Sequence, residues 1–413
     1  MTNNKEKKVL NVPNSTDRGN VIRNVPALRF PEFTDEWKKI RLDSFTERVM
    51  RKNKNNLSKL PLTISAQYGL VDQITFFNKV VASTDMSNYY LLKKGEFAYN
   101  KSYSSDYPWG AIKRLDNYEQ GALSSLYICF APKDNVETDF ILQYFESPKW
   151  HKGVSEIAVE GARNHGLLNI SVQDFFHTHH YMPKDKKEQA KIAKLLMFLD
   201  ERIATQNKII ERYESLIRGL NNTLQYDTGG KSVCLGDILL ERSERSRTNN
   251  QHEVLSSTVK GIFSQREYFS KDIASENNVG YKIIRLHDVV LSPQNLWMGN
   301  INYNEIFEIG IVSPSYKVFS IADGYDNQFV AAMLKTHRAL YSYMMVSEQG
   351  ASIVRRNLNM EAFSQLVFKI PSLDKQREIG CAISLLKSQL KTANKLIKAY
   401  TSQKQYLLRQ MFI

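Results

Sequence analysis

Three neighbouring histidines, His177, His179 and His180, form the first group in the sequence that could do chemistry, because imidazole is a common zinc ligand. A similar segment lies 188 residues later, and there glutamine, valine and phenylalanine occupy the same positions. We therefore interpret the histidines as part of a strand that leads into the next element. A metal site is the alternative interpretation.

The segment Thr-Gly-Gly-Lys-Ser at 228–232 resembles the end of a phosphate-binding loop. Such a loop begins with a glycine and follows a strand, whereas this chain has Gln225 at the first position and a helix is expected before it. We interpret the segment as a linker. No glycine-rich loop after a strand is found elsewhere, and we predict no catalytic residue and no cofactor bound by this chain.

Basic residues are better candidates for function. Arg51, Lys52 and Lys54 follow an early turn, and Arg245 and Arg247 lie at the equivalent place in the second half of the chain. Runs of charge are usually a solvated face, but their presence in both halves favours contacts with phosphate groups. Phosphate contacts give salt-sensitive affinity and orientation, without choice of sequence.

Reading a base sequence requires side chains that present hydrogen-bonding groups to base edges. Two polar and aromatic loops, 100–109 and 294–303, lie at equivalent positions in the two halves and differ in composition. Trp109 and Trp297 could equally belong to a core. Besides the basic residues named above, we predict that ten residues contact DNA. They are Lys101, Tyr103, Lys113, Arg114 and Arg163 in the first half, and Gln294, Asn295, Asn300, Arg355 and Arg356 in the second.

Two long helices are the elements that must position these residues. Apolar residues alternate at steps of four and three over more than four heptads, which is typical of a helix packed lengthwise on another helix. The first ladder is Ile192, Leu196, Leu199, Ile203, Gln206, Ile210, Tyr213, Ile217, Leu220 and Leu224. The second, 187 residues later, is Ile379, Ile383, Leu386, Leu390, Ala393, Ile397, Tyr400, Lys404, Leu407 and Met411. Gln206, the polar member, is expected to fix the register.

The similarity extends over the whole chain. Residues that recur in the same order, at shifts of 188 to 193, are Leu42, Gly69, Gln73, Gly110, Tyr127, Gly161 and Pro183, matched by Leu235, Gly261, Gln265, Gly299, Tyr316, Gly350 and Pro371. We predict a tandem duplication of a mixed α/β (α+β) domain followed by a long helix. The expected layout is a flexible tail at 1–27, domains at 28–182 and 228–370, and helices at 183–227 and 371–413. Asp185 and Glu188 suggest a capping box at the first helix.

The composition narrows the class of partner. The chain has 413 residues and a formal net charge of +13, which favours a polyanion, nucleic acid before a membrane surface. No run of about 20 apolar residues is found, and the N-terminus lacks the apolar core of a signal peptide. Cys129, Cys234 and Cys381 are isolated. We expect a cytoplasmic protein in a reducing compartment, without membrane contact.

An apolar helix face must be buried, so we predict that the two helices pack antiparallel as a coiled coil, with residue 192 facing 411 and 224 facing 379. A helix of roughly 40 residues is about 60 Å long. Similar domains at its two ends would form a pseudo-twofold pair within one chain. Because the domains differ in most residues, they should read different halves of a split, asymmetric DNA site.

In its two repeated domains and two long helices, the chain resembles the specificity subunit of type I restriction–modification enzymes. The resemblance is carried by the order of the parts: the entry segment Arg29-Phe30-Pro31-Glu32-Phe33, its echo at Leu235–Ile238, and the helix starts Pro183…Glu188-Gln189 and Pro371…Lys375-Gln376. It covers about residues 28–413. Two departures are Lys375 in place of Glu188 and Lys404 in place of Ile217.

The resemblance implies target-recognition domains that bind double-stranded DNA, and helices that set the spacer and dock two methyltransferase subunits. Two restriction (translocase-nuclease) subunits would join them in a bacterial cytoplasm. S-adenosylmethionine, ATP and Mg²⁺ would belong to these partners. The Asn/Asp-Pro-Pro-aromatic motif of amino-methyltransferases is absent from the sequence, which agrees with a non-catalytic subunit.

A different class of function stays open at this point. The chain could be a non-catalytic coiled-coil scaffold whose basic surface binds nucleic acid or acidic partners by charge alone. Such a scaffold would show no preference among DNA sequences.

Overall fold

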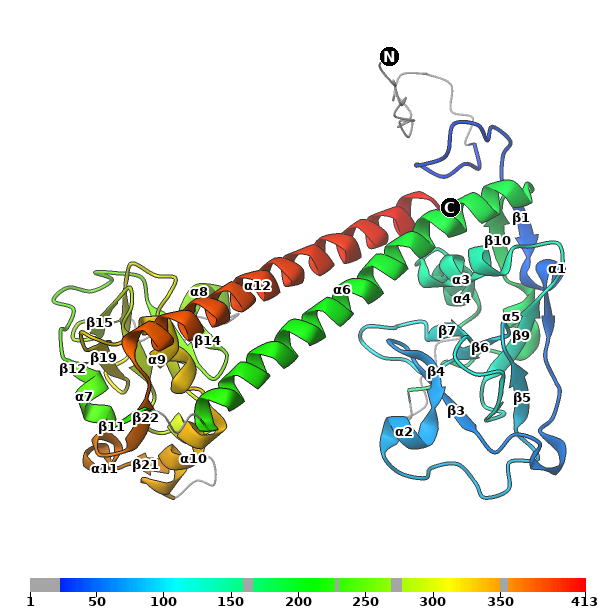
Figure 1. Ribbon diagram of the computed structural model, residues 1–413. Helices are drawn as coiled ribbons and strands as arrows, with labels where there is room; N and C mark the ends of the chain where they lie inside the picture. Colours follow the sequence, from blue (N-terminus) through cyan, green and yellow to red (C-terminus); the bar gives the residue numbers. More distant parts are fainter. Residues whose placement is uncertain (1–22, 159–165, 227–229, 269–276, 350–355) are drawn as a thin grey trace, which may run out of the picture. The chain divides into compact units, whose positions relative to one another are not determined.

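The computed structural model describes residues 23–158, 166–226, 230–268, 277–349 and 356–413. The chain forms two compact units. Unit 1 comprises the described residues up to Thr205 together with Ile397–Ile413, and unit 2 comprises Gln206–Leu396. Two long helices, α6 (Lys186–Tyr226) and α12 (Leu373–Gln410), each contribute to both units (Figure 1).

Unit 1 contains a two-stranded sheet, β1-β10, and two four-stranded sheets with the orders β2-β9-β6-β7 and β4-β3-β8-β5. All pairings are antiparallel except β3 with β8. The strands are β1 (Lys38–Arg41), β2 (Thr46–Arg48), β3 (Pro61–Ser65), β4 (Gly69–Asp72), β5 (Tyr90–Lys93), β6 (Phe97–Asn100), β7 (Ala111–Arg114), β8 (Gln120–Leu123), β9 (Ile128–Pro132) and β10 (His179–Met182).

Short helices join and cover these sheets. They are α1 (Leu42–Phe45), η1 (Lys54–Asn56), α2 (Gln73–Phe77), α3 (Thr138–Glu146), α4 (His151–Ile157) and α5 (Val172–His177). The main core is rich in aromatic residues, among them Trp37, Phe130 and Trp150, and it also includes Leu196 of α6 and Met411 just beyond α12. Both long helices are therefore part of the hydrophobic core of unit 1.

Unit 2 repeats this order of elements. Its sheet β12-β19-β16-β17 has the same strand order as β2-β9-β6-β7, and β11-β22 corresponds to β1-β10. Two pairs, β13-β14 and β15-β18, stand where unit 1 has one four-stranded sheet, and a parallel bridge between Val254 and Ile311 links them. The predicted duplication is confirmed at the level of elements and pairing.

The strands of unit 2 are β11 (Lys231–Cys234), β12 (Leu239–Arg242), β13 (Leu255–Thr258), β14 (Gly261–Ser264), β15 (Lys282–Arg285), β16 (Val289–Leu291), β17 (Ile301–Tyr303), β18 (Ile309–Val312), β19 (Lys317–Ile321), β20 (Ser347–Gln349), β21 (Arg356–Leu358) and β22 (Val367–Ile370). Its short helices are α7 (Leu235–Ile238), α8 (Gln265–Tyr268), η2 (Leu296–Met298), α9 (Asn327–Met333), α10 (His337–Met345) and α11 (Met360–Ser364).

The long helices bury the predicted ladders. On α6, Ile192, Leu196, Leu199 and Gln206 are buried. From Glu201 to Leu220 the remaining ladder residues are half-buried, and the residues outside the ladder are exposed. On α12, Ile383, Ala393 and Leu407 are buried. Burial that follows the four–three spacing means that the apolar face of each helix is covered.

Two polar contacts in unit 1 give the direction of the helix pair, and a third contact lies in unit 2. In unit 1, Lys404 forms an ion pair with Asp200, and Arg202 lies over the ring of Tyr400 at 6.0 Å. In unit 2, the side-chain amide of Gln206 donates to the carbonyl oxygen of Ala393 at 3.3 Å. The helices are antiparallel, and the unit 1 contacts lie within about one residue of the predicted register. In unit 2, Gln206 contacts Ala393, whereas the prediction places Ile397 opposite it. Gln206 makes the contact expected of a register residue.

The start of α6 differs from the prediction in one respect. The carboxylate of Asp185 accepts a hydrogen bond from the backbone N–H of Lys187 at 2.8 Å, as a capping residue should. The carboxylate of Glu188 does not complete a capping box, because it binds Arg29 and Trp37 instead. The capping-box prediction is therefore half wrong, since an ion pair from a distant segment replaces the local bond.

We predict that Leu199→Asp destabilises the protein by about 3 kcal/mol or more, because it places an unpaired carboxylate in the buried seam. The control is Leu216→Asp on the same helix, where Leu216 is 45% exposed and Leu199 only 7%. Urea unfolding followed by circular dichroism measures both changes. Equal losses of stability in the two variants would contradict a buried seam.

Candidate nucleic-acid interface

The basic residues after β2 are largely engaged within unit 1. Arg51 forms a bidentate ion pair with Glu96, with a shortest distance of 2.6 Å. Lys52 donates to the carbonyl oxygen of Asn88 at 2.8 Å and lies over the ring of Tyr90. Lys54 is exposed and makes no side-chain bond within the described ranges. Of the three, Lys54 is the residue whose charge is available to a phosphate.

Ion pairs of Lys113 and Arg114 connect strand β7 with helix α3. Lys113 pairs with Glu146 at 2.6 Å, and Arg114 pairs with Asp116 at 2.6 Å and Asp139 at 2.7 Å. Their side chains are only 13% and 12% exposed. A base-reading role for either residue stays a prediction that requires these pairs to open first.

The loop after β6 offers a more accessible candidate. The ring of Tyr103 is 59% exposed, while its backbone N–H donates to Gly166 at 2.6 Å and holds the loop in place. Lys101 donates to the carbonyl oxygen of Ile170 at 3.2 Å. Trp109 packs partly buried against the core, which agrees with its structural interpretation.

In unit 2, Arg245, Arg247 and Gln294 are exposed. Arg245 donates to the carbonyl oxygen of Gly280 at 2.9 Å and keeps its remaining donors on the surface. The guanidinium of Arg247 makes no bond to any residue that the structure describes. Asn295 is half-buried at the start of η2.

Asn300 and Arg356 are structural in this arrangement. Asn300 is 5% exposed, accepts from the hydroxyl of Ser257 at 2.8 Å and donates to the carbonyl oxygen of the same residue at 3.0 Å. The side chain of Asn300 completes a buried polar network, so its predicted contact with DNA stays a prediction that requires this network to open first. Arg356 donates to the hydroxyl and carbonyl oxygens of Ser347. Arg163 and Arg355 lie outside the described residues.

Two exposed residues that were not predicted as DNA contacts lie at hairpin turns. Tyr68, 63% exposed, precedes Gly69 in the turn between β3 and β4, and the exposed Lys260 precedes Gly261 in the turn between β13 and β14. Both glycines have positive φ, at 81° and 135°. The recurrence of this glycine in the two halves was the signal that could have identified the turns.

A repeated glutamine attaches each long helix to its own unit. In unit 1, Gln189 accepts from the backbone N–H of Glu137 at 2.8 Å and donates to the carbonyl oxygen of Pro183 at 2.9 Å. In unit 2, Gln376 accepts from Asp326 and donates to Pro371, both at 3.0 Å. Both glutamines are buried. We call this contact the glutamine clamp; it fixes the angle at which the helix leaves the domain.

The residue before each clamp differs between the units. Glu188 is 2% exposed and binds the guanidinium of Arg29 at 2.7 and 2.8 Å and the indole N–H of Trp37 at 3.1 Å. Lys375 takes this position in unit 2 and pairs with Glu378 on the surface. The Glu188 ion pair therefore ties the entry segment to α6 in unit 1.

The histidines form no metal site. His180 is 2% exposed, and its ring nitrogens bind the hydroxyls of Tyr144 at 2.8 Å and Thr178 at 2.7 Å. Burial, with a smaller effect of His179, lowers the pKa of His180 to about 3, so the ring is neutral. His179 and His180 lie on strand β10, as predicted. Among the described residues, no group of three potential ligands could hold a metal ion.

We predict that Gln189→Ala lowers the free energy of unfolding by about 1–3 kcal/mol, because a buried N–H and a buried carbonyl lose their partner. Gln403→Ala, at an exposed position of α12, is the matched control and should change stability little. Chemical denaturation measures both. If Gln189→Ala behaves like the control, the glutamine clamp does not hold the helix.

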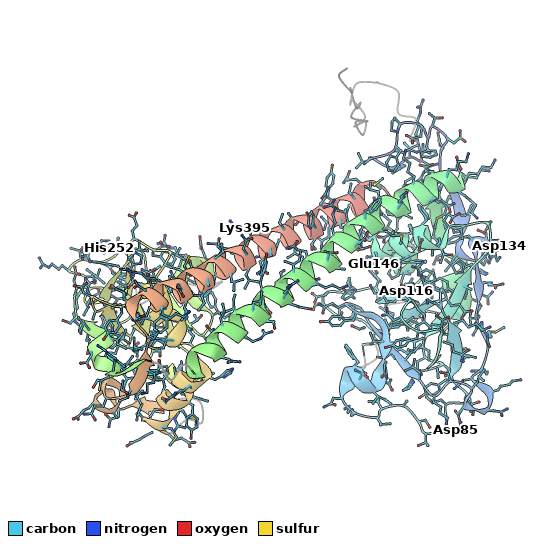
Figure 2. The ribbon with its side chains drawn as sticks, in the orientation of Figure 1. Asp85, Asp116, Asp134, Glu146, His252 and Lys395 are labelled. Carbon is cyan, nitrogen blue, oxygen red and sulfur yellow. The ribbon has the colours of Figure 1, made fainter. Side chains whose placement is uncertain are left out.

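Side chains cover the surface of both units and both helices (Figure 2).

None of the helices within the described ranges is long and apolar enough to cross a membrane.

Comparison with solved structures identifies the fold. Neither a search with protein-family models nor a search of curated proteins found a match. The S subunit of a type I restriction-modification system from M. genitalium is 16% identical, with a TM-score of 0.57, and the match covers 94% of this chain and 99% of that chain. A structure described under complex assembly and conformational transition of the type I R-M system is 13% identical, with a TM-score of 0.50, and the match covers 91% and 97%. The chain has the fold of a type I restriction–modification S subunit.

Proposed function

We propose that this chain is the DNA-recognition subunit of a type I restriction–modification complex and is itself non-catalytic. The observation that carries the proposal is the fold shared with an S subunit over 94% of the chain, in two units that repeat the same elements. A formal net charge of +13 suits a polyanionic ligand.

Each unit is proposed to read one half of a split site. Exposed side chains that suit this role are Lys54 and Tyr103 in unit 1, and Arg245, Arg247 and Gln294 in unit 2. The lysine and arginines would contact phosphates, and Tyr103 and Gln294 would face bases. Because the two sets differ, the two half-sites should differ as well.

The helix pair is proposed to fix the distance between the half-sites and to dock the partner subunits. α6 has 41 residues and is about 60 Å long. The proposed partners are two methyltransferase subunits and two restriction subunits, in the cytoplasm of a bacterium. S-adenosylmethionine, ATP and Mg²⁺ would act on those subunits.

Selection from randomised duplexes tests the function. The complex of this chain with its methyltransferase partner should enrich one bipartite sequence, and exchange of one domain for that of a relative should change one half only. Enrichment of no sequence, with affinity that follows salt concentration alone, would favour the scaffold with a basic surface.

A paired insertion tests the helices as a ruler. Four residues added after Lys208 in α6 and four before Lys395 in α12 should lengthen the pair by about 6 Å, or up to two base pairs at about 3.4 Å each. The half-sites should stay the same while the gap between them grows. Replacement of four exposed residues without insertion is the control. An unchanged gap would show that the helices do not set the spacing.

A further inference from the structure

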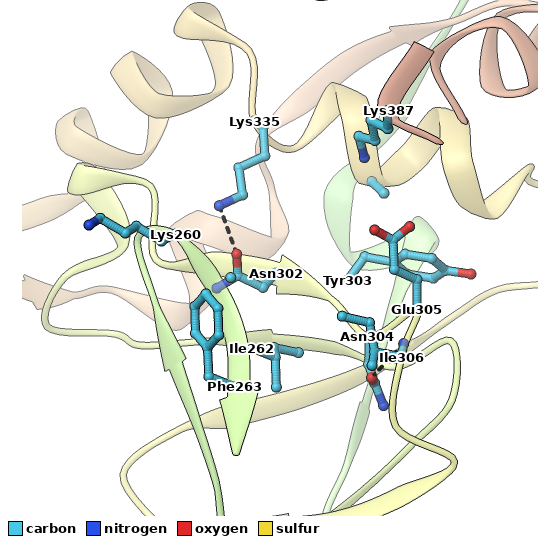
Figure 3. A pocket seen from close by; sticks show the side chains of 12 residues that line it. Lys260, Ile262, Phe263, Asn302, Tyr303, Asn304, Glu305, Ile306, Lys335 and Lys387 are labelled. Atoms are coloured by element: carbon cyan, nitrogen blue, oxygen red, sulfur yellow. Dashed lines mark hydrogen bonds between the residues drawn. The ribbon is translucent and has the colours of Figure 1, made fainter. Parts of the chain in front are cut away.

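A cavity in unit 2 has an unusual balance of charge. It has a volume of about 350 Å³ and lies between the β13–β14 turn, the segment after β17, α9 and α12. Its lining includes the ammonium-bearing residues Lys260, Lys335 and Lys387 and a single carboxylate, Glu305. Figure 3 shows Lys335 and Lys387 directed toward Asn302, Tyr303 and Glu305 on the opposite side.

Lys335 has only neutral hydrogen-bond partners. Its ammonium group donates to the carbonyl oxygen of Gly299 at 2.7 Å and to the side-chain oxygen of Asn302 at 2.8 Å. Burial, with a smaller effect of the charge of Lys387, lowers the pKa of Lys335 to about 8. Lys387 itself makes no ion pair with any described residue. Two like charges therefore share the cavity without a carboxylate bound to either.

The equivalent positions of unit 1 are neutralised. Strand pairing sets the correspondence: Phe97 pairs with Arg114 in β6–β7, and its counterpart Val289 pairs with Tyr303 in β16–β17. Lys113 is thus equivalent to Asn302. Ser147 and Thr336 are equivalent, because the hydroxyl of each donates to the carbonyl oxygen three residues earlier. The residues that precede them, Glu146 and Lys335, are therefore equivalent as well.

The comparison reveals a reversal of charge. Unit 1 joins Lys113 to Glu146 in an ion pair, whereas unit 2 joins Lys335 to the neutral amide of Asn302. The glutamine clamps set a second correspondence, in which Asp200 is equivalent to Lys387. Asp200 is paired with Lys404. At both positions an acid with a basic partner has become a base without an acidic partner.

We propose that this cavity of unit 2 binds a phosphate group through the charges of Lys335 and Lys387. A phosphate monoester carries up to two negative charges and would offset both ammonium groups, whereas a DNA phosphodiester carries one and would offset one of them; lysine binds either as a point charge. The phosphate belongs either to a DNA backbone or to a small phosphorylated molecule; both present anionic phosphate oxygens to the two ammonium groups. Only the DNA source depends on the proposed function.

Thermal unfolding of the full chain with inorganic phosphate tests the site. Phosphate should raise the melting temperature of the wild type above the value in sodium chloride of equal ionic strength, because ligand binding stabilises the folded state. Lys387→Asp, which restores the acid of unit 1, should abolish most of this rise. Lys395→Ala, at an exposed position of α12, should retain it. Equal rises in all three proteins, or none, would overturn the proposal.

Salt titration of binding to a non-specific duplex identifies the source of the phosphate. If it belongs to DNA, Lys387→Asp should reduce the slope of log affinity against log salt by about one. If the phosphate-dependent rise is lost while the slope stays unchanged, a small molecule is the ligand. Neither measurement uses sequence preference, so failure of the proposed DNA-reading function would leave this result intact.

Discussion

Burial of an apolar seam between α6 and α12 is the interaction on which the rest of the structure depends. Each helix carries a four–three ladder of apolar residues that must be buried away from water. In unit 1 the ladders of both helices are part of the hydrophobic core, and in unit 2 Ile379 of α12 packs against the core. The glutamine clamps then fix the start of each helix to a globular unit. In unit 1 the arrangement makes two helix segments that are distant in sequence part of one core.

Duplication explains what the two units share, and divergence explains what separates them. The clamp, the capping hydroxyls of Ser147 and Thr336 and the order of the central sheet are kept. The side chains that differ include charged ones: Glu188 against Lys375, and Glu146 against Lys335. The order of the central sheet is thus kept while charge changes. Such a pair of domains suits two ligands of one class that differ in detail.

Much of the fold could be predicted from the sequence, because its signals are local or periodic. The spacing of the ladder predicted the helices and their antiparallel pairing, and the recurrence of Gly110 as Gly299 marked a repeat that the strand pairing bears out. Candidate contacts were harder to predict. Arg51 pairs with Glu96, and Asn300 bonds Ser257, 43 residues away. Whether a polar residue is free or engaged depends on partners distant in sequence, which spacing does not reveal.

We propose that one chain presents two different readers at a fixed separation. Mapping methylated adenines in DNA from cells that express this chain with its methyltransferase partner measures both properties at once. We expect one bipartite sequence with two unlike halves and an unread gap of constant length. A continuous or palindromic site, or a gap of variable length, would contradict the account.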